Sequence, residues 1–335
     1  MVAIPTVPRW RPQDEASMML AMSTVDPNNM VWIPGGMFRM GSDDHYPEEG
    51  PAHDVEVDGF WMDPHPVTNE EFARFVDATG HVTSAERAPL AEDYPGALPE
   101  LLVPASVVFV PPAHRVDLSQ PTWWDLVPGA DWRRPRGPGS SVEGLSDHPV
   151  CHVAWEDAEA YAAWVGKSIA TEAEWEFASR GGLDGAEYAW GDELNPNGEY
   201  LANNWQGEFP AENLALDGFE ATSPVGSYPA NAYGLFDMIG NVWEWTSDWY
   251  QSHTEIERSC CTMTNPRGSS KAASIDPALP DIPIPRKVMK GGSYLCAPNY
   301  CRRYRPAARM AQPIDTSTCH LGFRCMTRDQ TSTGV

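Results

Sequence analysis

Length, composition and charge limit what this chain can be. Its 335 residues suit one large domain or two ordinary ones, and a hydrophobic content of 42% allows a substantial core. The formal charge of −24 argues against binding nucleic acid through the phosphate backbone, and it would attract basic peptides or cations. The 27 glycines and 32 prolines, beside 14 tryptophans, indicate a folded domain rich in loops, and bound metal ions are one candidate for what pins such loops.

The sequence also bears on the cellular compartment. No apolar run approaches 18 residues, so we predict neither a transmembrane helix nor a membrane partner. The N-terminus lacks a basic stretch followed by an apolar core, so no signal peptide is predicted. Seven cysteines is an odd number for a disulfide framework, which favours a reducing, cytoplasmic compartment with free thiols. We expect a monomer.

The first elements predicted along the chain are short. Residues 1–28 read as a polar, flexible leader. Residues 31–42 begin as a strand and run into a Gly-rich turn. An acidic loop then leads into a second strand, which shows the alternation of a half-buried strand at Val55 and Val57.

A helix is predicted over residues 65–81. Thr68 and Glu71 form a capping box at its start, and Gly80 is placed to end it. The apolar stripe of this helix consists of Phe72, Phe75 and Val76.

Residues 82–147 are rich in proline and hard to assign. They contain a short apolar run at 106–112 and an aromatic set made of Trp123, Trp124 and Trp132. The tryptophan pair at 123 and 124 could line a peptide groove, although core packing explains it equally well.

Two more helices are predicted in the middle of the chain. A strand-like lead from residue 148 passes into a helix from about Trp155 to Val165. The next helix lies within residues 168–182, and its capping box and stop are supplied by Thr171 with Glu174 and by Gly181. From there to residue 286 the chain reads mostly as loop. With no repeat or dividing linker, the fold class predicted is α+β, a single compact domain over residues 29–330 with little regular secondary structure.

Two cysteines five positions apart, Cys296 and Cys301, lie within residues 287–309. Five residues span about 7.5 Å in a helix and roughly 16 Å in a strand, whereas sulfurs that share a bond or a metal need Cα atoms within about 7 Å. Pro298 argues against a helix and Asn299 favours a turn. Only a loop folded back on itself would join the sulfurs, and spacing alone leaves a disulfide, a metal site or unpaired thiols open.

Seven phrases of the sequence resemble those of one family. They are MGSDD (40–44), HPVTNEEFARFV (65–76), ATEAEWEFASRGG (170–182), NNWQGEFP (203–210), ANAYGLFDMIGNVWEWTSDWY (230–250), KGGSYLCAPNYCRRYRPAAR (290–309) and HLGFRC (320–325). Their order and wording resemble the formylglycine-generating enzymes, the activators of type I sulfatases, over roughly residues 31–328. TEAEWE and GNVWEW also occur in members of the superfamily without catalytic cysteines, whereas GGSYLCAPNYC is typical of the catalytic branch. One departure, Ala170 where proline is usual, concerns helix entry.

The resemblance implies a compact, metal-pinned fold related to C-type lectins. It also implies an enzyme that oxidises the cysteine of a Cys-x-Pro-x-Arg motif in type I sulfatases to Cα-formylglycine, with O2, a thiol reductant and Cu(I). Breaking a C–H bond with O2 needs a redox metal or an organic cofactor. The chain has no dinucleotide-binding fingerprint, which argues against a dinucleotide cofactor.

The resemblance assigns the copper site to the cysteine pair. Cys296 and Cys301 would hold Cu(I), a soft ion, and Cys301 would be the more exposed sulfur and the more reactive toward thiols. Ser293 would hold the substrate or bound oxygen by hydrogen bonding. The residues expected to contact the substrate polypeptide are Tyr300, Arg302 and Trp243.

Two further patches imply structural Ca²⁺, which prefers oxygen ligands. The first set of ligands implied by the resemblance comprises the side chains of Asn203 and Asp217 and the carbonyls of Asn204 and Phe219. The second set comprises the carboxylates of Asp237 and Glu244 and the carbonyls of Gly240 and Val242. For both patches, ordinary turn-forming Asn and Asp are the alternative.

Other candidate ligands are weaker. Cys260 and Cys261 are adjacent and could bind a soft metal, although structural thiols are the simpler interpretation. His148 and His152 have i, i+4 spacing, but Pro149 argues against a helix there.

Two alternative functions stay open. One is a non-catalytic member of the superfamily that binds a peptide or protein, against which the two cysteines argue. The other is an iron-dependent relative that forms C–S bonds. Such enzymes usually carry an added helical domain with a His/Glu iron triad, for which this chain has neither the room nor the motif.

Overall fold

The structure is a computed structural model, and it describes residues 29–255 and 262–328. The predicted leader, residues 1–28, lies outside the described residues, as do Cys260 and Cys261.

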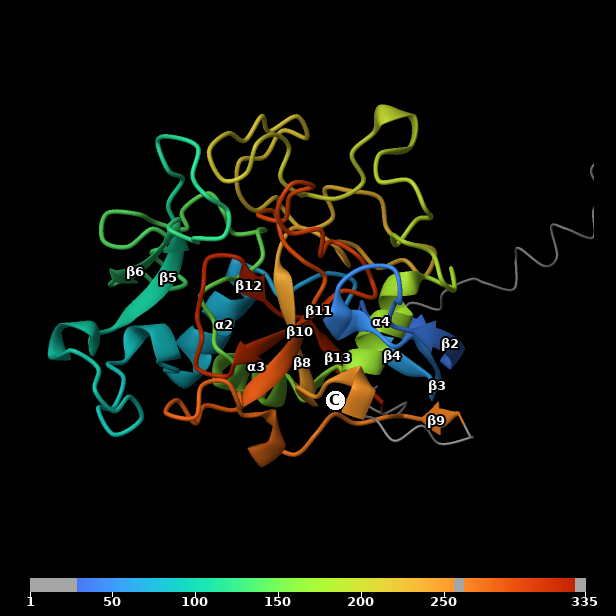
Figure 1. The fold of residues 1–335 in the computed structure, drawn as a ribbon, viewed down its shortest axis with the longest axis horizontal. Helices are drawn as coiled ribbons and strands as arrows, with labels where there is room; N and C mark the ends of the chain where they lie inside the picture. Colours follow the sequence, from blue (N-terminus) through green and yellow to red (C-terminus); the bar gives the residue numbers. More distant parts are fainter. Residues whose placement is uncertain (1–28, 256–261, 329–335) are drawn as a thin grey trace, which may run out of the picture.

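Within the described residues, short strands form four small sheets (Figure 1). The first sheet has the order β1-β4-β13-β7, with bounds Val31–Ile33, Phe60–Met62, Cys325–Thr327 and Ser168–Ile169. The second has the order β11-β10-β8-β12, with bounds Arg309–Pro313, Arg286–Lys290, Trp243–Trp249 and Leu321–Gly322. The third has the order β2-β3-β9, with bounds Gly36–Met40, His53–Val57 and Met263–Thr264. The fourth is the pair β5-β6, Ala105–Phe109 and Trp124–Pro128. Pairing is antiparallel except between β12 and β8 and between β3 and β9.

The described residues contain three α-helices, α2, α3 and α4, which span Asn69–Thr79, Trp155–Trp164 and Glu172–Arg180. Short 3-10 helices lie at Pro47–Glu49, Ser84–Glu86, Pro99–Leu101, Pro196–Gly198, His253–Glu255 and Ala272–Ser274. No helix among the described residues is long and apolar enough to cross a membrane.

Capping residues decide where α2 and α4 begin and end. The Thr68 and Thr171 side chains cap the two N-termini in capping boxes, each completed by a glutamate three residues later. Gly80 and Gly181 follow the two helices in the left-handed conformation, with φ of 70° and 56°. The helix starts and stops predicted from the sequence are therefore confirmed.

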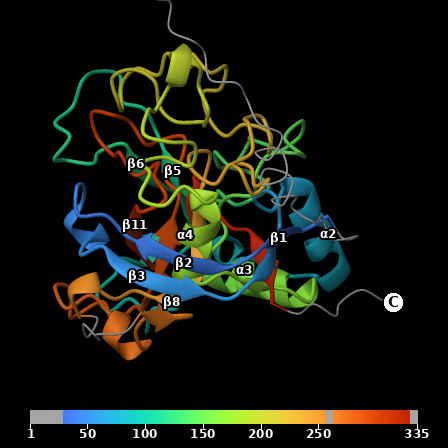
Figure 2. The ribbon, with the colours of Figure 1, turned by 90° about the vertical axis from the view of Figure 1, so that its right-hand side faces the viewer.

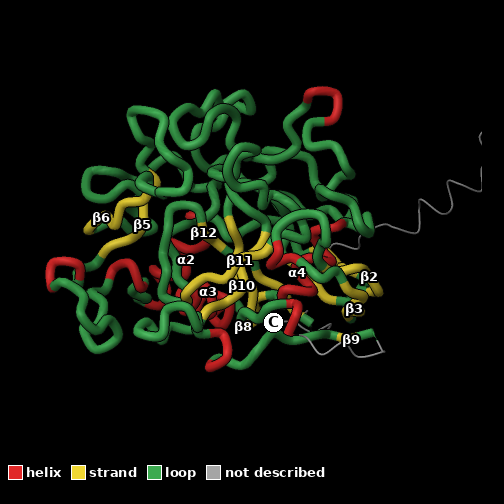
Figure 3. The backbone as a smooth tube through the Cα atoms, viewed as in Figure 1, coloured by secondary structure: helices red, strands yellow, loops and turns green. Residues whose placement is uncertain are grey.

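Loops make up most of the molecule. Figure 3 shows the upper part of the view built mostly from loops, with one short helical segment, whereas most helices and strands lie in the lower part. Helix α4 packs on strands β8 and β10 of the second sheet, and Figure 2 shows α4 beside strands β2 and β3 as well. The prediction of an α+β domain with little regular secondary structure is confirmed.

In the part of the chain that the structure describes, two hydrophobic clusters fill the interior. The larger lies between the helices and the first three sheets and contains Phe72, Trp175, Trp245 and Phe323. The smaller is built from loop residues and contains Trp123, Trp205, Phe209, Tyr294, Leu295 and Ala297. Cys296 belongs to the larger cluster although both its neighbours belong to the smaller one, so the cysteine segment lies where the two clusters meet.

The described residues between 183 and 286 are mostly loop, as predicted, but the sequence interpretation missed strand β8. This strand lies in the interior of its sheet, and five of its seven residues are buried on both faces. A strand buried on both faces lacks the alternation that marks a half-buried strand. The sequence of β8, which contains three tryptophans, therefore gave no periodic signal for a strand.

Candidate active site

The cysteine segment connects β10 to β11, and its two ends are held together. Lys290 and Arg309 are directly opposite each other in the β10–β11 pair. Glu176 on α4 accepts a hydrogen bond from Lys290 Nζ at 2.8 Å, and Glu172, one turn earlier, binds Arg309 at 2.6 and 2.8 Å. Because residues four apart lie on one face of a helix, α4 fixes both ends of the segment.

Glycine allows the segment to fold tightly after β10. Gly292 has φ of 70°, and a Cβ atom there would lie 2.7 Å from the carbonyl oxygen of Arg303. The chain therefore passes so close to its own later part that only glycine fits. This explains the Gly-Gly-Ser phrase before the cysteines.

The segment folds back between the two cysteines. The backbone N–H groups of Tyr300 and Cys301 both donate to the carbonyl of Ala297, at 3.1 and 3.0 Å, which closes a turn over Pro298. The sulfurs of Cys296 and Cys301 lie 3.3 Å apart, and both cysteines are free. The predicted fold-back is confirmed, and so is the greater exposure of Cys301, since Cys296 is buried.

The two thiols differ in charge at neutral pH. The hydrogen bond with Cys296 lowers the pKa of Cys301 from 9.0 to about 6, burial opposes this shift, and the positive charge of Arg303 supports it. Burial raises the pKa of Cys296 well above 9.0. The pair therefore consists of a thiolate at Cys301 and a thiol at Cys296 that donates to it.

The cysteines line a cavity of about 290 Å³. Three of the predicted site residues line it as well: Ser293, Tyr300 and Trp243. Its further walls are largely apolar and include Trp124, Phe209, Met289, Leu295 and Met310. A cavity of this kind, with a few polar groups and a reactive thiolate, is the usual form of a binding site.

Ser293 is tied to the cysteines through its backbone. Its N–H donates to the sulfur of Cys296 at 3.4 Å, and its hydroxyl oxygen accepts from the N–H of Leu295 at 3.3 Å. The residue is almost fully buried, with 1% of its surface exposed. A serine hydroxyl that accepts one hydrogen bond can still donate another, so the predicted role of Ser293 stays a prediction.

Tyr300 forms part of an aromatic wall. Its ring stacks on Phe209 with centroids 4.7 Å apart and meets the edge of Trp123 at 5.2 Å. Trp123 is fully buried, so of the predicted tryptophan pair it belongs to the core, whereas Trp124 faces the cavity.

Arg302 lies outside this cavity. Its guanidinium pairs with Glu187 at 3.0 Å, and about half of its side chain is exposed to solvent. Arg303 lines the cavity instead, and its Nη1 lies 3.7 Å from the sulfur of Cys301. The sequence interpretation missed Arg303, although in an extended stretch residues two apart point the same way, which could have singled it out. A substrate contact of Arg302 stays a prediction.

A second cavity, of about 620 Å³, lies behind one wall of the first. Val107 and Thr318 line the first cavity, whereas their neighbours Val108 and Cys319 line the second. Cys319 therefore follows a residue of the first cavity in the sequence, but it faces the second cavity.

The first predicted calcium set lies in one loop that closes on itself. Asp217 accepts from the hydroxyl of Tyr228 at 3.0 Å and from the backbone N–H of Phe219 at 3.1 Å. Gln206 bridges Asn204 and Asp217 by bonding the carbonyl of one and the N–H of the other. The side chain of Asn203 donates to the carbonyl of Ala221 at 2.8 Å, so its amide oxygen is turned away from that bond. One carboxylate with amide and carbonyl oxygens is a donor set that suits Ca²⁺.

The second predicted calcium set does not fit a cation. Both carboxylate oxygens of Glu244 bind the guanidinium of Arg324, at 2.7 to 3.0 Å, and one also accepts from Trp175 Nε1. This pair is buried and already neutral, and a calcium ion would have to displace the guanidinium. Gly240 and Val242 lie in the turn before Glu244 and contribute no charge.

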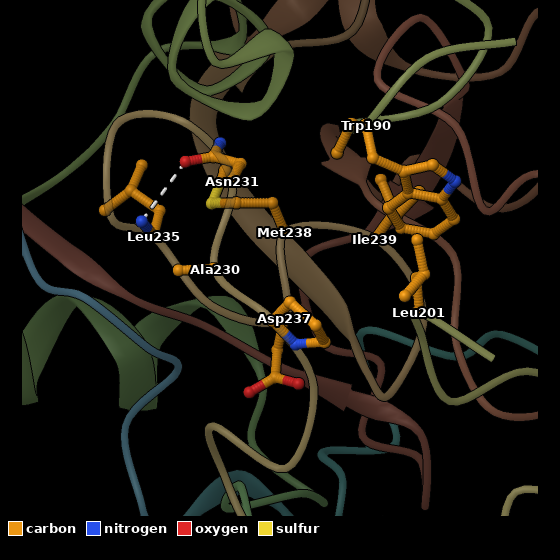
Figure 4. A pocket seen from close by; sticks show the side chains of 10 residues that line it. Trp190, Leu201, Ala230, Asn231, Leu235, Asp237, Met238 and Ile239 are labelled. Atoms are coloured by element: carbon orange, nitrogen blue, oxygen red, sulfur yellow. Dashed lines mark hydrogen bonds between the residues drawn. The ribbon is translucent and has the colours of Figure 1, made fainter. Parts of the chain in front are cut away.

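Asp237, the other carboxylate of that set, lies at a small cavity of about 40 Å³, roughly the room of one water molecule. Figure 4 shows the carboxylate of Asp237 pointing away from Trp190 and Leu201. Nearby in the same view, the N–H of Leu235 donates to the side-chain oxygen of Asn231. Asp237 accepts from the N–H of Gly226 at 2.7 Å, and burial raises its pKa to about 6.

No group of three or more His, Cys, Asp or Glu side chains able to hold a metal occurs in the part of the chain that the structure describes. His148 and His152 do not share a site: the first bonds Thr222 at 3.0 Å and the second bonds Ser106 at 2.7 Å. The predicted copper site has only two ligands, Cys296 and Cys301, and therefore does not count as such a group of three.

The site has the character of a thiol-dependent enzyme: two sulfurs in contact, one ionised, at the wall of a cavity that admits a ligand. Comparison with known families matches residues 16–329 to the sulfatase-modifying factor enzyme 1-like domain. The chain therefore belongs to the formylglycine-generating enzyme family and has its C-type-lectin-related fold.

Individual relatives agree over nearly the whole chain. The formylglycine-generating enzyme of Mycobacterium tuberculosis is 50% identical over 301 residues, which cover 89% of this chain and 97% of that protein. The inactive C-alpha-formylglycine-generating enzyme 2 of Mus musculus is 40% identical over 304 residues, or 88% of this chain and 84% of that protein. The solved structure of PvdO from Pseudomonas aeruginosa aligns with a TM-score of 0.57 at 24% identity, covering 89% of this chain and 93% of that one, which shows a shared fold.

Proposed function

We propose that this protein oxidises the cysteine of a Cys-x-Pro-x-Arg motif in a sulfatase polypeptide to Cα-formylglycine. The observation that supports it best is the pair of free thiols, with sulfurs 3.3 Å apart, at the wall of a cavity large enough for part of a peptide. The family assignment agrees. Because an inactive relative is nearly as similar as active ones, the site and not the overall identity carries the proposal.

The overall reaction balances with one O2 and two thiols of the reductant. The methylene thiol of the substrate cysteine becomes an aldehyde, its sulfur leaves as hydrogen sulfide, and O2 supplies the aldehyde oxygen and the oxygen of one water. The reductant supplies two electrons and two protons and becomes a disulfide. The net change is an oxidation of the substrate carbon, which needs an activated form of oxygen.

Cu(I) would be held by Cys296 and Cys301, and it would supply the one-electron chemistry that activates O2. Two sulfurs in contact form a soft donor set that suits this ion. The low pKa of Cys301 favours the deprotonated form that a metal ligand needs.

The other residues of the cavity bind and orient the substrate. The hydroxyl of Ser293, fixed by its bond with Leu295, would donate to the substrate or to oxygen beside Cys296. Trp243 and the stacked ring of Tyr300 would cover the peptide and exclude water. The cavity is largely apolar, which suits the proline of the motif.

One structural calcium ion is proposed at Asn203, Asn204, Asp217 and Phe219, and none at the second set. We further propose that the protein works as a monomer in a reducing, cytoplasmic compartment. Five free cysteines among the described residues support this compartment.

The test uses copper-loaded protein, O2, a thiol reductant and a short Cys-x-Pro-x-Arg peptide, with mass spectrometry of the peptide. The expected product is an aldehyde, absent when Cys301→Ser replaces the wild type. Cys319→Ser is the matched control, because Cys319 is a partly exposed thiol that faces the other cavity. Peptide binding without aldehyde formation would favour the non-catalytic alternative, and undiminished product from Cys301→Ser would exclude the proposed site.

A further inference from the structure

Arg303 touches the sulfur of Cys301 and is itself held from two sides. Its Nη1 donates toward the sulfur at 3.7 Å. Its Nε donates to Glu48 Oε1 at 3.1 Å, and its Nη2 binds the same carboxylate. Its guanidinium carbon lies 3.8 Å from the ring centroid of Tyr46. One planar group therefore contacts an anion, an aromatic face and a sulfur at once.

Glu48 and Tyr46 belong to one turn, residues 46–49, which we call the acidic turn. It is closed by the N–H of Glu49, which donates to the carbonyl of Tyr46 at 2.9 Å. The same turn also holds the residues beside Arg303. The Tyr46 hydroxyl accepts from the backbone N–H of Arg302 at 3.1 Å, and Glu49 pairs with Arg305 in the interior.

The two Arg–Glu pairs of the acidic turn have different surroundings. The Arg305–Glu49 pair is buried, with side chains 1% and 0% exposed, and it anchors the segment to the turn. The Arg303–Glu48 pair is 20% and 23% exposed, and Arg303 faces the cavity. Breaking this partly exposed pair should therefore cost less stability than breaking the buried one. The contact with Cys301 is what distinguishes Arg303.

We propose that Arg303 is a positioning residue: oriented by Glu48 and Tyr46, it holds the Cys301 sulfur where both sulfurs can bind Cu(I). This inference rests on the proposed function. A group that orients a metal ligand from the second layer typically changes metal affinity by 10- to 100-fold when it is removed. A lysine in its place keeps the charge but cannot bond Glu48 and the sulfur with one rigid plane.

The experiment measures the Cu(I) dissociation constant of the full chain by competition with a chromophoric Cu(I) chelator. Arg303→Lys and Glu48→Gln should each weaken Cu(I) binding by about 10- to 100-fold. The double variant should bind no more weakly than Arg303→Lys alone, because Glu48 acts through Arg303. The melting temperature of the metal-free protein should change little in all three variants, which separates positioning from a folding role.

The chain offers a matched control elsewhere. Arg286 pairs with Asp276 at 2.6 Å, with side chains 16% and 30% exposed, and its guanidinium carbon lies 5.3 Å from the ring centroid of Tyr250. This cluster repeats the chemistry of the Arg303 cluster and does not line the cysteine cavity. Asp276→Asn should leave Cu(I) affinity unchanged.

Unchanged Cu(I) affinity in both Arg303→Lys and Glu48→Gln would overturn the inference and leave the proposed function standing. Losses of Cu(I) affinity that add fully in the double variant would show that Glu48 does not act through Arg303. Wild-type protein that binds no Cu(I) would overturn the copper site itself, and this inference with it.

Discussion

The two sulfurs of the cavity should differ sharply as nucleophiles in metal-free protein. A thiol with a pKa of about 6 is mostly thiolate at pH 7, whereas the buried Cys296 stays protonated. We expect alkylation at Cys301 to outpace alkylation at Cys151 and Cys325, which are buried thiols with raised pKa values, by well over tenfold. The rate at Cys301 should rise between about pH 5 and 7 and then level off. Peptide mapping after timed exposure to iodoacetamide measures each site.

The Arg303→Lys variant is the control for the alkylation rate at Cys301, because lysine keeps a positive charge near the Cys301 sulfur. If Cys301 reacted no faster than Cys151 in the wild type, or if its rate still rose steeply above pH 8, the assignment of the thiolate to Cys301 would be wrong.

Asp237 should destabilise the folded protein at neutral pH. Its folded pKa of about 6 lies above the ordinary 3.8, so the unfolded chain releases the proton first as the pH rises. Stability is therefore lost between about pH 4 and pH 6, by up to about 3 kcal/mol. Asp237→Asn should raise the free energy of unfolding at pH 7.5 by up to that amount and change it little at pH 4. Asparagine also tolerates the φ of 54° found there.

Urea unfolding of metal-free protein at the two pH values measures this difference. An Asp237→Asn variant that is less stable than wild type at pH 7.5 without calcium would contradict the expectation. Loss of calcium-dependent stability in the same variant would instead show that Asp237 does bind the ion.

At the scale of single elements, helix α4 packs in the core and also holds the two ends of the cysteine segment by ion pairs. Its glutamates at 172 and 176 form these ion pairs. Burial alone would raise the pKa of Glu176, but the charges of Lys290 and Arg180 lower it to about 2. The contribution of Glu176 to stability is therefore complete above about pH 4.5 and is lost as the pH falls toward 2.

Glu176→Gln should cost about 3–5 kcal/mol at pH 7, because it leaves the buried Arg180 without its counter-charge and Lys290 with only the more distant Glu172, at 3.8 Å. Denaturant unfolding of the metal-free protein measures the loss. The comparison variant is Glu70→Gln, which breaks the exposed pair with Arg74 and should cost no more than about 1 kcal/mol. Equal losses in the two variants would mean that α4 does not anchor the segment through this charge.

The elements that the sequence predicted well are those with local signals. Capping boxes and stop glycines lie at the ends of the helices they define, so the starts and stops of α2 and α4 could be predicted directly. Strand β8 could not be, because its pattern depends on which other segments cover both its faces. The ion pair of Glu244 could not be predicted for the same reason. Its partner, Arg324, lies eighty residues away and no local pattern connects them.

At the scale of the whole molecule, the sequence predicted that the two sulfurs of the candidate site come together, but it did not predict the residues that surround them. The turn over Pro298 is local, and it brings Cys296 and Cys301 together. Arg303 gains its role from Glu48, which belongs to a turn near the other end of the chain. Such contacts depend on the tertiary fold, which in a loop-rich molecule few sequence patterns specify.

A fold with so much loop should depend on the ion that closes one of its loops. If Asn203, Asn204, Asp217 and Phe219 bind Ca²⁺, calcium at a hundred times its dissociation constant should stabilise the protein by about 2.7 kcal/mol. Asp217→Asn should abolish that gain while nearly preserving calcium-free stability, since its amide oxygen can still accept from Tyr228. Thermal unfolding with calcium and with a chelator measures both quantities. A calcium gain that survives Asp217→Asn but disappears in Glu244→Gln would move the ion to the second set, against the ion pair seen there.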